Sequence, residues 1–302
     1  MANVLSKGSL FPEELVKGMI NQVKGESVLA QLTGATPIPF NGQTEFIFNF
    51  DNEISIVAEN AKKPAQGASI STRTITPLKV VYTMRTSDEF MIENDAYQLG
   101  VLQAFGEGFA RKLARGFDLM ALHGINPFDD KASTTIGTNC FDKAGVQAVT
   151  AAKGASMDAT IEAAIALVQD KEYDVTGLAM APAVRSALAA LTYDGGQKLY
   201  PQLAWGSNPG SINGMPVQVS ANISHKASDV TTTDQFLLGD FRNNFRWGFA
   251  RQMPIEVIQY GDPDNTGVDL KGSNQVAIRG EAYLGWAIFD PNAFALHSIS
   301  AV

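Results

Sequence analysis

The feature that most constrains this chain is an uninterrupted helical pattern between Asn94 and Gly124. The segment has no proline, and its apolar residues recur at steps of three and four, which places them on one side of an α-helix. Asn94 or Asp95 can cap the first turn, and Gly124 can end the helix. The apolar stripe consists of Leu102, Phe105, Phe109, Leu113, Phe117 and Met120. The pattern predicts a helix about 40 Å long, against which other parts of the fold must pack.

The remaining positions of this helix are mostly polar, and we expect them to face outward. They are Glu107, Arg111, Lys112, Arg115 and Asp118. Gly106 and Gly108 resemble the start of a dinucleotide-binding loop, but no strand precedes them and Arg111 stands where a third glycine is required. We therefore interpret the apolar stripe as core packing and not as a cofactor site.

Composition narrows the class of protein. The chain has 302 residues, 45% of them hydrophobic and 18% charged, which is enough for a large core in one or two domains. A net charge of -8 argues against broad nucleic-acid binding, because such binding neutralises phosphates with lysine and arginine. The start of the chain lacks a secretory pattern, which predicts a cytoplasm-like compartment. The single cysteine, Cys140, excludes an intrachain disulfide and is interpreted as a small apolar residue.

The N-terminal part is interpreted as an arm. Proline at position 12 and two acidic residues after it are typical of a first helical turn. Leu15, Met19 and Val23 form a short apolar face that is too small to fold alone. We expect this arm to dock on another surface, with a neighbouring chain as one candidate.

The next segment reads as one long hairpin. Phe46, Phe48 and Phe50 alternate with other residues, and Ile54 and Ile56 continue that alternation. A polar tip follows over residues 57–67, and a returning strand begins near residue 70. An isolated two-stranded hairpin is marginally stable in water, so a hairpin of this length implies a partner surface.

The rest of the chain predicts a mixed body of helices and strands. A helix opens at Ser156 with Ile161, Ile165 and Val168 on one face, and another covers 182–191. Residues 125–155 and 192–214 are loop-like. Strands are expected near 177–181, 216–220, 236–240, 245–249, 255–260 and 276–289.

Candidate chemical sites are weak. The histidines His123, His225 and His297 each lack carboxylate or cysteine partners at metal-ligand spacing in the sequence. Asp262–Gly267 resembles the start of a calcium loop, but Ser273 stands at the twelfth position where a glutamate is required, which favours an ordinary turn. Asp129–Asp130 could be a carboxylate pair but is interpreted as a solvated loop. Asn222 begins a glycosylation sequon, which has no role in a protein that is not secreted. We expect no cofactor, no metal and no enzymatic activity.

The order of these parts resembles a known family. The parts occur in a definite order along the chain. They are the arm, a hairpin ending in Val57–Pro64, the long helix entered through Ser87–Phe90, the segments Gly214–Val219 and Leu238–Phe241, and then Asp290–Phe294. This order is similar to that of the major capsid protein of tailed bacteriophages with the Hong Kong 97 fold. The resemblance implies an α+β fold with a long spine helix, an extended loop (E-loop), a peripheral domain (P-domain) and an axial domain (A-domain).

The resemblance also implies domain boundaries and partners. The arm covers 1–33 and the E-loop 34–82. The P-domain covers 83–140 and 241–289, and the A-domain covers 141–240 and 290–302. Copies are expected to form hexamers and pentamers of an icosahedral shell, assembled in the host cytoplasm, that encloses double-stranded DNA without sequence-specific contacts and without a membrane. Scaffolding, portal and decoration proteins are further implied partners.

One chemistry of the family can be placed on this sequence. In the founding member a loop lysine forms an isopeptide bond with an asparagine of another subunit, assisted by a glutamate. Lys63, Asn274 and Glu281 match these positions, although Ala282 and Tyr283 depart from the founder's charged surroundings. A lysine desolvated between subunits can lose its proton to a carboxylate and attack the amide.

Three alternatives stay open at this stage. The founder carries an N-terminal scaffolding segment, and here the arm begins near Met1, so we expect either a cleaved segment, a separate scaffolding protein or none. An encapsulin-like bacterial compartment would share the fold but enclose protein. An α/β enzyme with an unusual site is disfavoured by the few histidines and the single cysteine.

Overall fold

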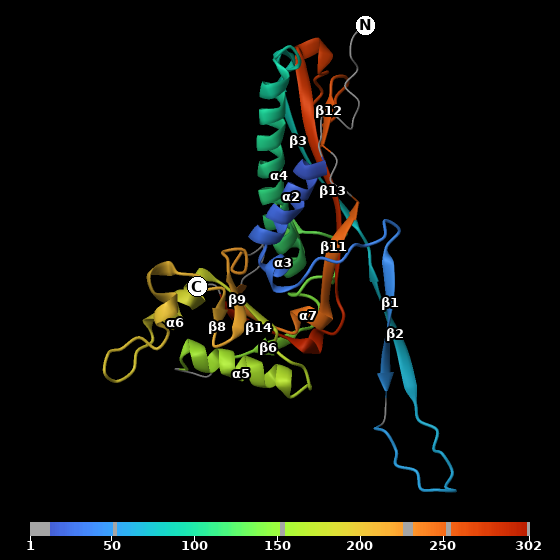
Figure 1. Ribbon diagram of the computed structural model, residues 1–302, viewed down its shortest axis with the longest axis vertical. Helices are drawn as coiled ribbons and strands as arrows, with labels where there is room; N and C mark the ends of the chain where they lie inside the picture. Colours follow the sequence, from blue (N-terminus) through green and yellow to red (C-terminus); the bar gives the residue numbers. More distant parts are fainter. Residues whose placement is uncertain (1–12, 51–52, 152–154, 226–231, 252–254, 301–302) are drawn as a thin grey trace.

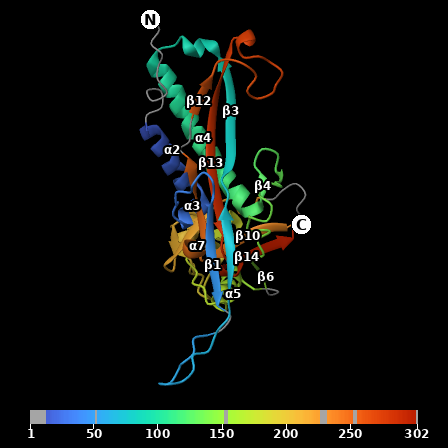
Figure 2. The same cartoon turned by 90° about the vertical axis from the view of Figure 1, so that its right-hand side faces the viewer.

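A computed structural model describes residues 13–50, 53–151, 155–225, 232–251 and 255–300 (Figure 1). A long helix and a long sheet run side by side along the upper part of the molecule. A second domain lies below and to one side of them, and a thin hairpin projects on the opposite side. The quarter-turn view separates the helix from the sheet and shows the hairpin continuing below both domains (Figure 2).

The long helix, α4, covers Asp95–His123. Asn94 accepts a hydrogen bond from the Tyr97 amide, 2.9 Å away, and Gly124 ends the helix in the left-handed region with φ 66°. The predicted helix, its caps and its buried stripe are therefore confirmed. The expectation that Asp118 faces outward is wrong, because its side chain is fully buried.

The first sheet has four antiparallel strands arranged around β13 (Gln275–Ile288). β3 (Leu78–Ser87) pairs along one side of β13. β11 (Phe245–Arg251) and β12 (Ile255–Ile258) pair with successive parts of its other side.

This sheet packs on α4 through aromatic side chains. The ring of Phe117 lies 5.0 Å from that of Trp247 and 5.7 Å from that of Trp286. Gly280 allows the close approach, since a Cβ atom there would lie 3.0 Å from the ring of Phe109. The spine helix and β13 thus form one core.

The N-terminal helices α2 (Glu13–Glu26) and α3 (Val28–Leu32) lie on this core. Met19 and Val23 are buried, and α2 packs against α4 of the same chain. The predicted docking of the arm on another surface is confirmed for α2 and α3, and the surface that covers Met19 and Val23 belongs to the same chain, so the candidate of a neighbouring chain is not needed there. The prediction for residues 1–12 lies outside the described residues.

The second domain is built on a six-stranded sheet with the order β6-β14-β10-β7-β9-β8. Helices α5 (Met157–Gln169) and α6 (Pro182–Ala190) pack against it, as their apolar faces predict. Strand β14 has no counterpart among the predicted strands. The strand bounds are β6 Gln147–Val149, β7 Gly177–Met180, β8 Ser211–Ile212, β9 Met215–Val219, β10 Thr232–Gly239 and β14 Phe294–Ser300.

Short elements connect these parts. β4 and β5 form a small hairpin after the spine helix, and the described residues also contain four short 3-10 segments and one short α-helix. Their bounds are β4 Ile125–Asn126, β5 Lys131–Ala132, α7 Phe241–Asn244, η1 Asp88–Met91, η2 Pro201–Gly206, η3 Lys271–Ser273 and η4 Pro291–Ala293.

The projecting hairpin consists of β1 (Gln43–Phe50) and β2 (Ala68–Ile75), paired antiparallel with Phe48 opposite Ile70. The predicted hairpin is confirmed. The expectation that Ile54 and Ile56 extend the strand is wrong, since these residues lie in irregular backbone at the tip. Among the described residues they have no cross-strand partner that would hold them extended.

Candidate functional site

The paired part of the hairpin, strands β1 and β2, is called the blade, and it exposes large apolar side chains. Phe46 and Phe48 on β1 and Ile70 on β2 share one face, because cross-strand register places Phe48 opposite Ile70. Their exposed fractions are 67%, 57% and 59%. At the tip, Ile54 and Ile56 are almost completely exposed. A contiguous apolar surface of this kind is typical of a surface that another protein covers.

The root of the hairpin is anchored, in contrast to its blade. Ile75 is fully buried and packs with Ile38 and Ala287. The amide of Thr36 donates to the carbonyl oxygen of Trp247 at 2.9 Å, so the chain entering the hairpin runs along β11. Glu45 also forms an ion pair with Arg246. The hairpin is therefore held by the subunit at one end only.

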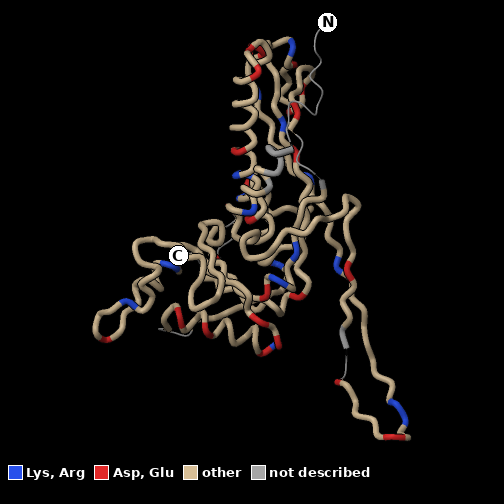
Figure 3. Tube along the Cα trace, viewed as in Figure 1, with Lys and Arg blue, Asp and Glu red and all other residues tan. Residues whose placement is uncertain are grey.

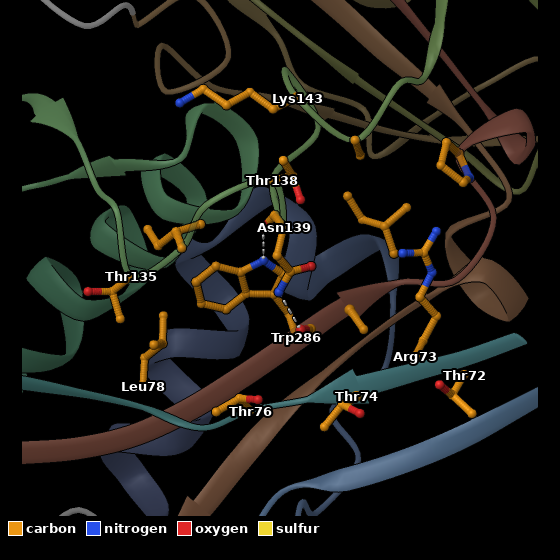
Figure 4. Close-up of a pocket in the computed structure, with 15 residues that line it drawn as sticks. Thr72, Arg73, Thr74, Thr76, Leu78, Thr135, Thr138, Asn139, Lys143 and Trp286 are labelled. Carbon is orange, nitrogen blue, oxygen red and sulfur yellow. Dashed lines mark hydrogen bonds between the residues drawn. The ribbon is translucent and has the colours of Figure 1, made fainter.

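A polar cavity of about 590 Å³ lies beside this root (Figure 4). Asn139 and Trp286 brace its wall, because each donates to the other's carbonyl oxygen, at 2.9 and 2.8 Å. Arg73 and Lys143 line it together with several threonine hydroxyls, and neither forms an ion pair with another described residue. Chemically this cavity suits a polar segment with hydrogen-bond acceptors.

The three predicted cross-link residues do not meet within one chain. Lys63 is exposed at the hairpin tip, and Asn274 is exposed just before β13. Glu281 lies seven residues along the strand direction from Asn274, a separation of roughly 23 Å in extended chain. The Lys79 ammonium lies 2.8 Å from the Glu281 carboxylate.

Residues Asp262–Gly267 form a loop that binds an arginine. The guanidinium of Arg85 donates to Asp262 at 2.7 Å, to Thr266 at 2.6 Å, and also to Asp264. The Arg85 hydrogen bonds lower the pKa of Asp264 to about 2. The segment that resembled a calcium loop therefore directs its side-chain oxygens at the Arg85 guanidinium instead of a metal ion. This contact explains the turn that was predicted here.

His123 lies at the junction of the two domains. Its Nδ1 is 3.0 Å from Asp142 and 3.3 Å from Asp234, and its Nε2 is 2.9 Å from the carbonyl oxygen of Asn222. Burial opposes a charge on the ring, but hydrogen bonds with both carboxylates outweigh it and raise the pKa of His123 to about 10. Burial raises the pKa of Asp142 to about 6. The histidine is therefore a buried imidazolium between two acids.

The same three side chains are a group that could hold a metal ion, since their ligand atoms lie within 4.8 Å of one another in the described part of the chain. A protonated His123 already satisfies both carboxylates and the carbonyl, so the arrangement is complete as an ion-pair network. The expectation that His123 lacks carboxylate partners is wrong, because Asp142 and Asp234 come from distant segments that the sequence does not align.

The remaining predicted candidates have ordinary roles. His225 Nε2 lies 3.1 Å from Oδ1 of Asp130 at the surface. His297 Nδ1 lies 2.9 Å from the Val149 carbonyl oxygen. Cys140 is buried, and burial raises its thiol pKa to about 11, so it is no nucleophile. The Asn222 amide donates to Asp118 at 2.9 Å.

Along the Cα trace, Lys and Arg residues are interspersed with Asp and Glu residues over both domains and the hairpin tip (Figure 3). In the same residues, no helix is long and apolar enough to cross a membrane.

The model of the phage capsid family matches residues 7–299. A structure from Mycobacterium phage Ogopogo is 32% identical over 90% of this chain and 92% of its own, with a TM-score of 0.75. A structure from Gordonia phage Cozz is 24% identical over 92% and 87%, with a TM-score of 0.76. The capsid of an empty GTA particle shares the fold at 16% identity, covering 91% and 90%, with a TM-score of 0.61. None of the curated proteins compared matches the chain.

Proposed function

This chain belongs to the phage capsid family, and we propose that the exposed blade of its β1–β2 hairpin is the surface that a neighbouring copy covers in the assembled shell. The protein is a structural one, a major capsid protein whose copies assemble into the shell of a virion.

The observation that carries the proposal is the contrast between the two ends of the hairpin. Its root is buried in the subunit, whereas Phe46, Phe48 and Ile70 are more than half exposed on one face. Complete burial of an exposed side chain of this kind contributes up to about 1.5–3 kcal/mol, so covering the remaining half of each one stabilises an assembly by less than that, and every copy contributes the same face. A two-stranded hairpin is marginal alone, so a covering surface also keeps the blade ordered.

The arrangement of copies follows from the family resemblance. We propose hexamers and pentamers, with the A-domain (141–240 and 290–302) at their centres, the P-domain (83–140 and 241–289) outside it and the E-loop (34–82) lying over a neighbour. The shell would enclose double-stranded DNA, and a net charge of -8 is consistent with a wall that does not bind its contents tightly. Scaffolding, portal and decoration proteins stay predictions.

The cross-link between Lys63 and Asn274 also stays a prediction. Because these residues and Glu281 lie apart in one chain, the bond requires groups from different copies. Boiling assembled shells in denaturant before electrophoresis tests it: covalently linked ladders support the bond, and monomers alone exclude it.

The assembly surface is tested by changing Phe46 and Phe48 to serine together. We expect the variant to fold as a subunit but to lose particles in negative-stain micrographs and in size-exclusion profiles. Ser71→Ala, on the opposite face of the same ribbon, is the matched control and should assemble normally. Particles of the double variant that are as abundant as those of the control would contradict the proposal.

The contents of purified particles test the enclosed cargo. Nuclease-protected double-stranded DNA in particles from infected cells supports the virion function. Particles that contain a foreign protein and no DNA would instead indicate an encapsulin-like compartment.

A further inference from the structure

Among the described residues, Trp205 is the most exposed large hydrophobic side chain of the second domain. Its exposed fraction is 105%, whereas the chain's other two tryptophans, Trp247 and Trp286, are each 1% exposed. An indole side chain offers about 150–250 Å² for burial. Tryptophan is highly buried on average in folded proteins, so a fully exposed indole departs from what is usual for this residue type.

The backbone at Trp205 is also unfavourable for tryptophan. Its φ and ψ are 58° and 24°, in the left-handed region, and Gly206 follows with φ 80°. The Ser207 amide donates to the Ala204 carbonyl oxygen at 3.2 Å and closes the turn. Turns with two positive φ angles favour asparagine, aspartate and glycine at these central positions. The turn geometry therefore does not explain why a tryptophan occupies this position. We look for the reason in what its exposed side chain contacts.

The subunit holds this turn in place. Leu203 anchors one side with an exposed fraction of 1%. On the other side Arg185, on α6, donates from Nη1 to the Gly206 carbonyl oxygen at 2.9 Å. A side chain presented on an anchored turn loses little conformational freedom when a partner covers it. The indole is thus displayed in a fixed position.

The position of the turn identifies the kind of partner. The segment between α6 and β8 lies at the edge of the second domain that faces away from the β1–β2 hairpin (Figure 1). In a closed ring of identical subunits, each copy uses different surfaces on its two sides to contact its neighbours. Resting on the shell function above, we propose that Trp205 is an anchor that inserts into the second domain of an adjacent copy when the shell assembles. Tryptophan is enriched among the residues that dominate such interfaces.

Intrinsic fluorescence tests this directly. Trp247 and Trp286 are already buried in the subunit, so a change on assembly reports Trp205, and the spectrum of Trp205→Phe identifies its contribution by difference. We expect the Trp205 emission to move to shorter wavelength, and its quenching by acrylamide to fall, as subunits become particles. If particles form and Trp205 remains fully quenchable, the anchor is refuted while the shell function stands. If no particles form under any condition, both proposals fail.

A substitution separates the side chain from its backbone. Asparagine tolerates the left-handed region, so Trp205→Asn should leave the isolated subunit as stable as, or more stable than, the wild type. The same variant should raise the protein concentration needed for assembly about tenfold or more, as expected for loss of a dominant interface residue. Trp205→Phe, which keeps an aromatic ring, should be affected less. Assembly of Trp205→Asn at the wild-type concentration would overturn the proposal.

Discussion

Ser27 Oγ donates a hydrogen bond of 2.6 Å to Oδ1 of Asp118, although 91 residues separate the two side chains in the chain. The same carboxylate accepts the amides of Val28 and Leu29 at the first turn of α3 and the side-chain amide of Asn222. Burial raises the pKa of Asp118. One carboxylate on the spine helix thereby holds the N-terminal arm and the second domain together.

Asp118→Ala should lower the free energy of unfolding by about 3 kcal/mol, because it leaves several buried donors without an acceptor. Chemical denaturation of unassembled subunits measures this loss. Ser27→Ala removes one cap hydroxyl and should cost only about 1 kcal/mol. Equal losses in the two variants would contradict the central role of the carboxylate.

Two glycines of α4 test whether the arm docks within its own chain. A Cβ atom at Gly108 meets no atom within 4 Å, so Gly108→Ala should stabilise the subunit by up to ~1 kcal/mol through helix propensity. At Gly106 the same atom would lie 3.1 Å from Met19 Sδ. Gly106→Ala should therefore gain less than Gly108→Ala, or lose stability. Equal melting temperatures for the two variants would indicate that α2 does not pack on α4 of the same copy.

The buried imidazolium predicts a pH dependence of stability. The folded pKa of His123, about 10, lies above its ordinary value of 6.5, so its contribution is complete below pH 6.5 and is lost as the pH rises towards 10. One proton corresponds to a slope approaching 1.4 kcal/mol per pH unit within this window. Urea denaturation of subunits between pH 6.5 and 10 measures it.

His123→Gln should flatten that slope. His225→Gln removes the partly buried histidine beside Asp130 and should leave the slope unchanged. If the wild type and His123→Gln lose stability in parallel over this range, His123 does not carry the proton.

The loop Asp262–Gly267 is expected to open locally when Arg85, whose guanidinium it binds, is replaced by lysine. Arg85→Lys removes the planar guanidinium that contacts Asp262, Asp264 and Thr266 together. Amide hydrogen exchange at Gly267, whose N–H donates to Asp262, should become faster while exchange in α4 does not. Arg111→Lys, on the exposed face of α4, is the control. Unchanged exchange at Gly267 would show that the loop holds its conformation without the arginine.

Addition of calcium provides a second readout of this loop. Since Arg85 already occupies the oxygen atoms of Asp262–Gly267, wild-type exchange at Gly267 should not respond to the ion.

The sequence by itself determined the parts whose signals are local. The limits and apolar face of α4, the alternation of the β1–β2 hairpin and the helix at Ser156 all follow from spacing within a few residues, where side-chain direction depends only on helix or strand geometry. The order of these parts also indicated the family, because each segment keeps its place along the chain whatever its contacts.

Tertiary structure alone decided which side chains meet. Asp118 looked like a solvent-facing acid because its position on the helix is polar, yet α3 and Asn222 surround it. Arg85 and Asp264 are 179 residues apart, and no period relates such positions. Trp205 could have filled a core, as Trp247 and Trp286 do, but the tertiary structure leaves it in solvent on a left-handed turn. These outcomes depend on how the elements fold back on one another, which local spacing does not encode.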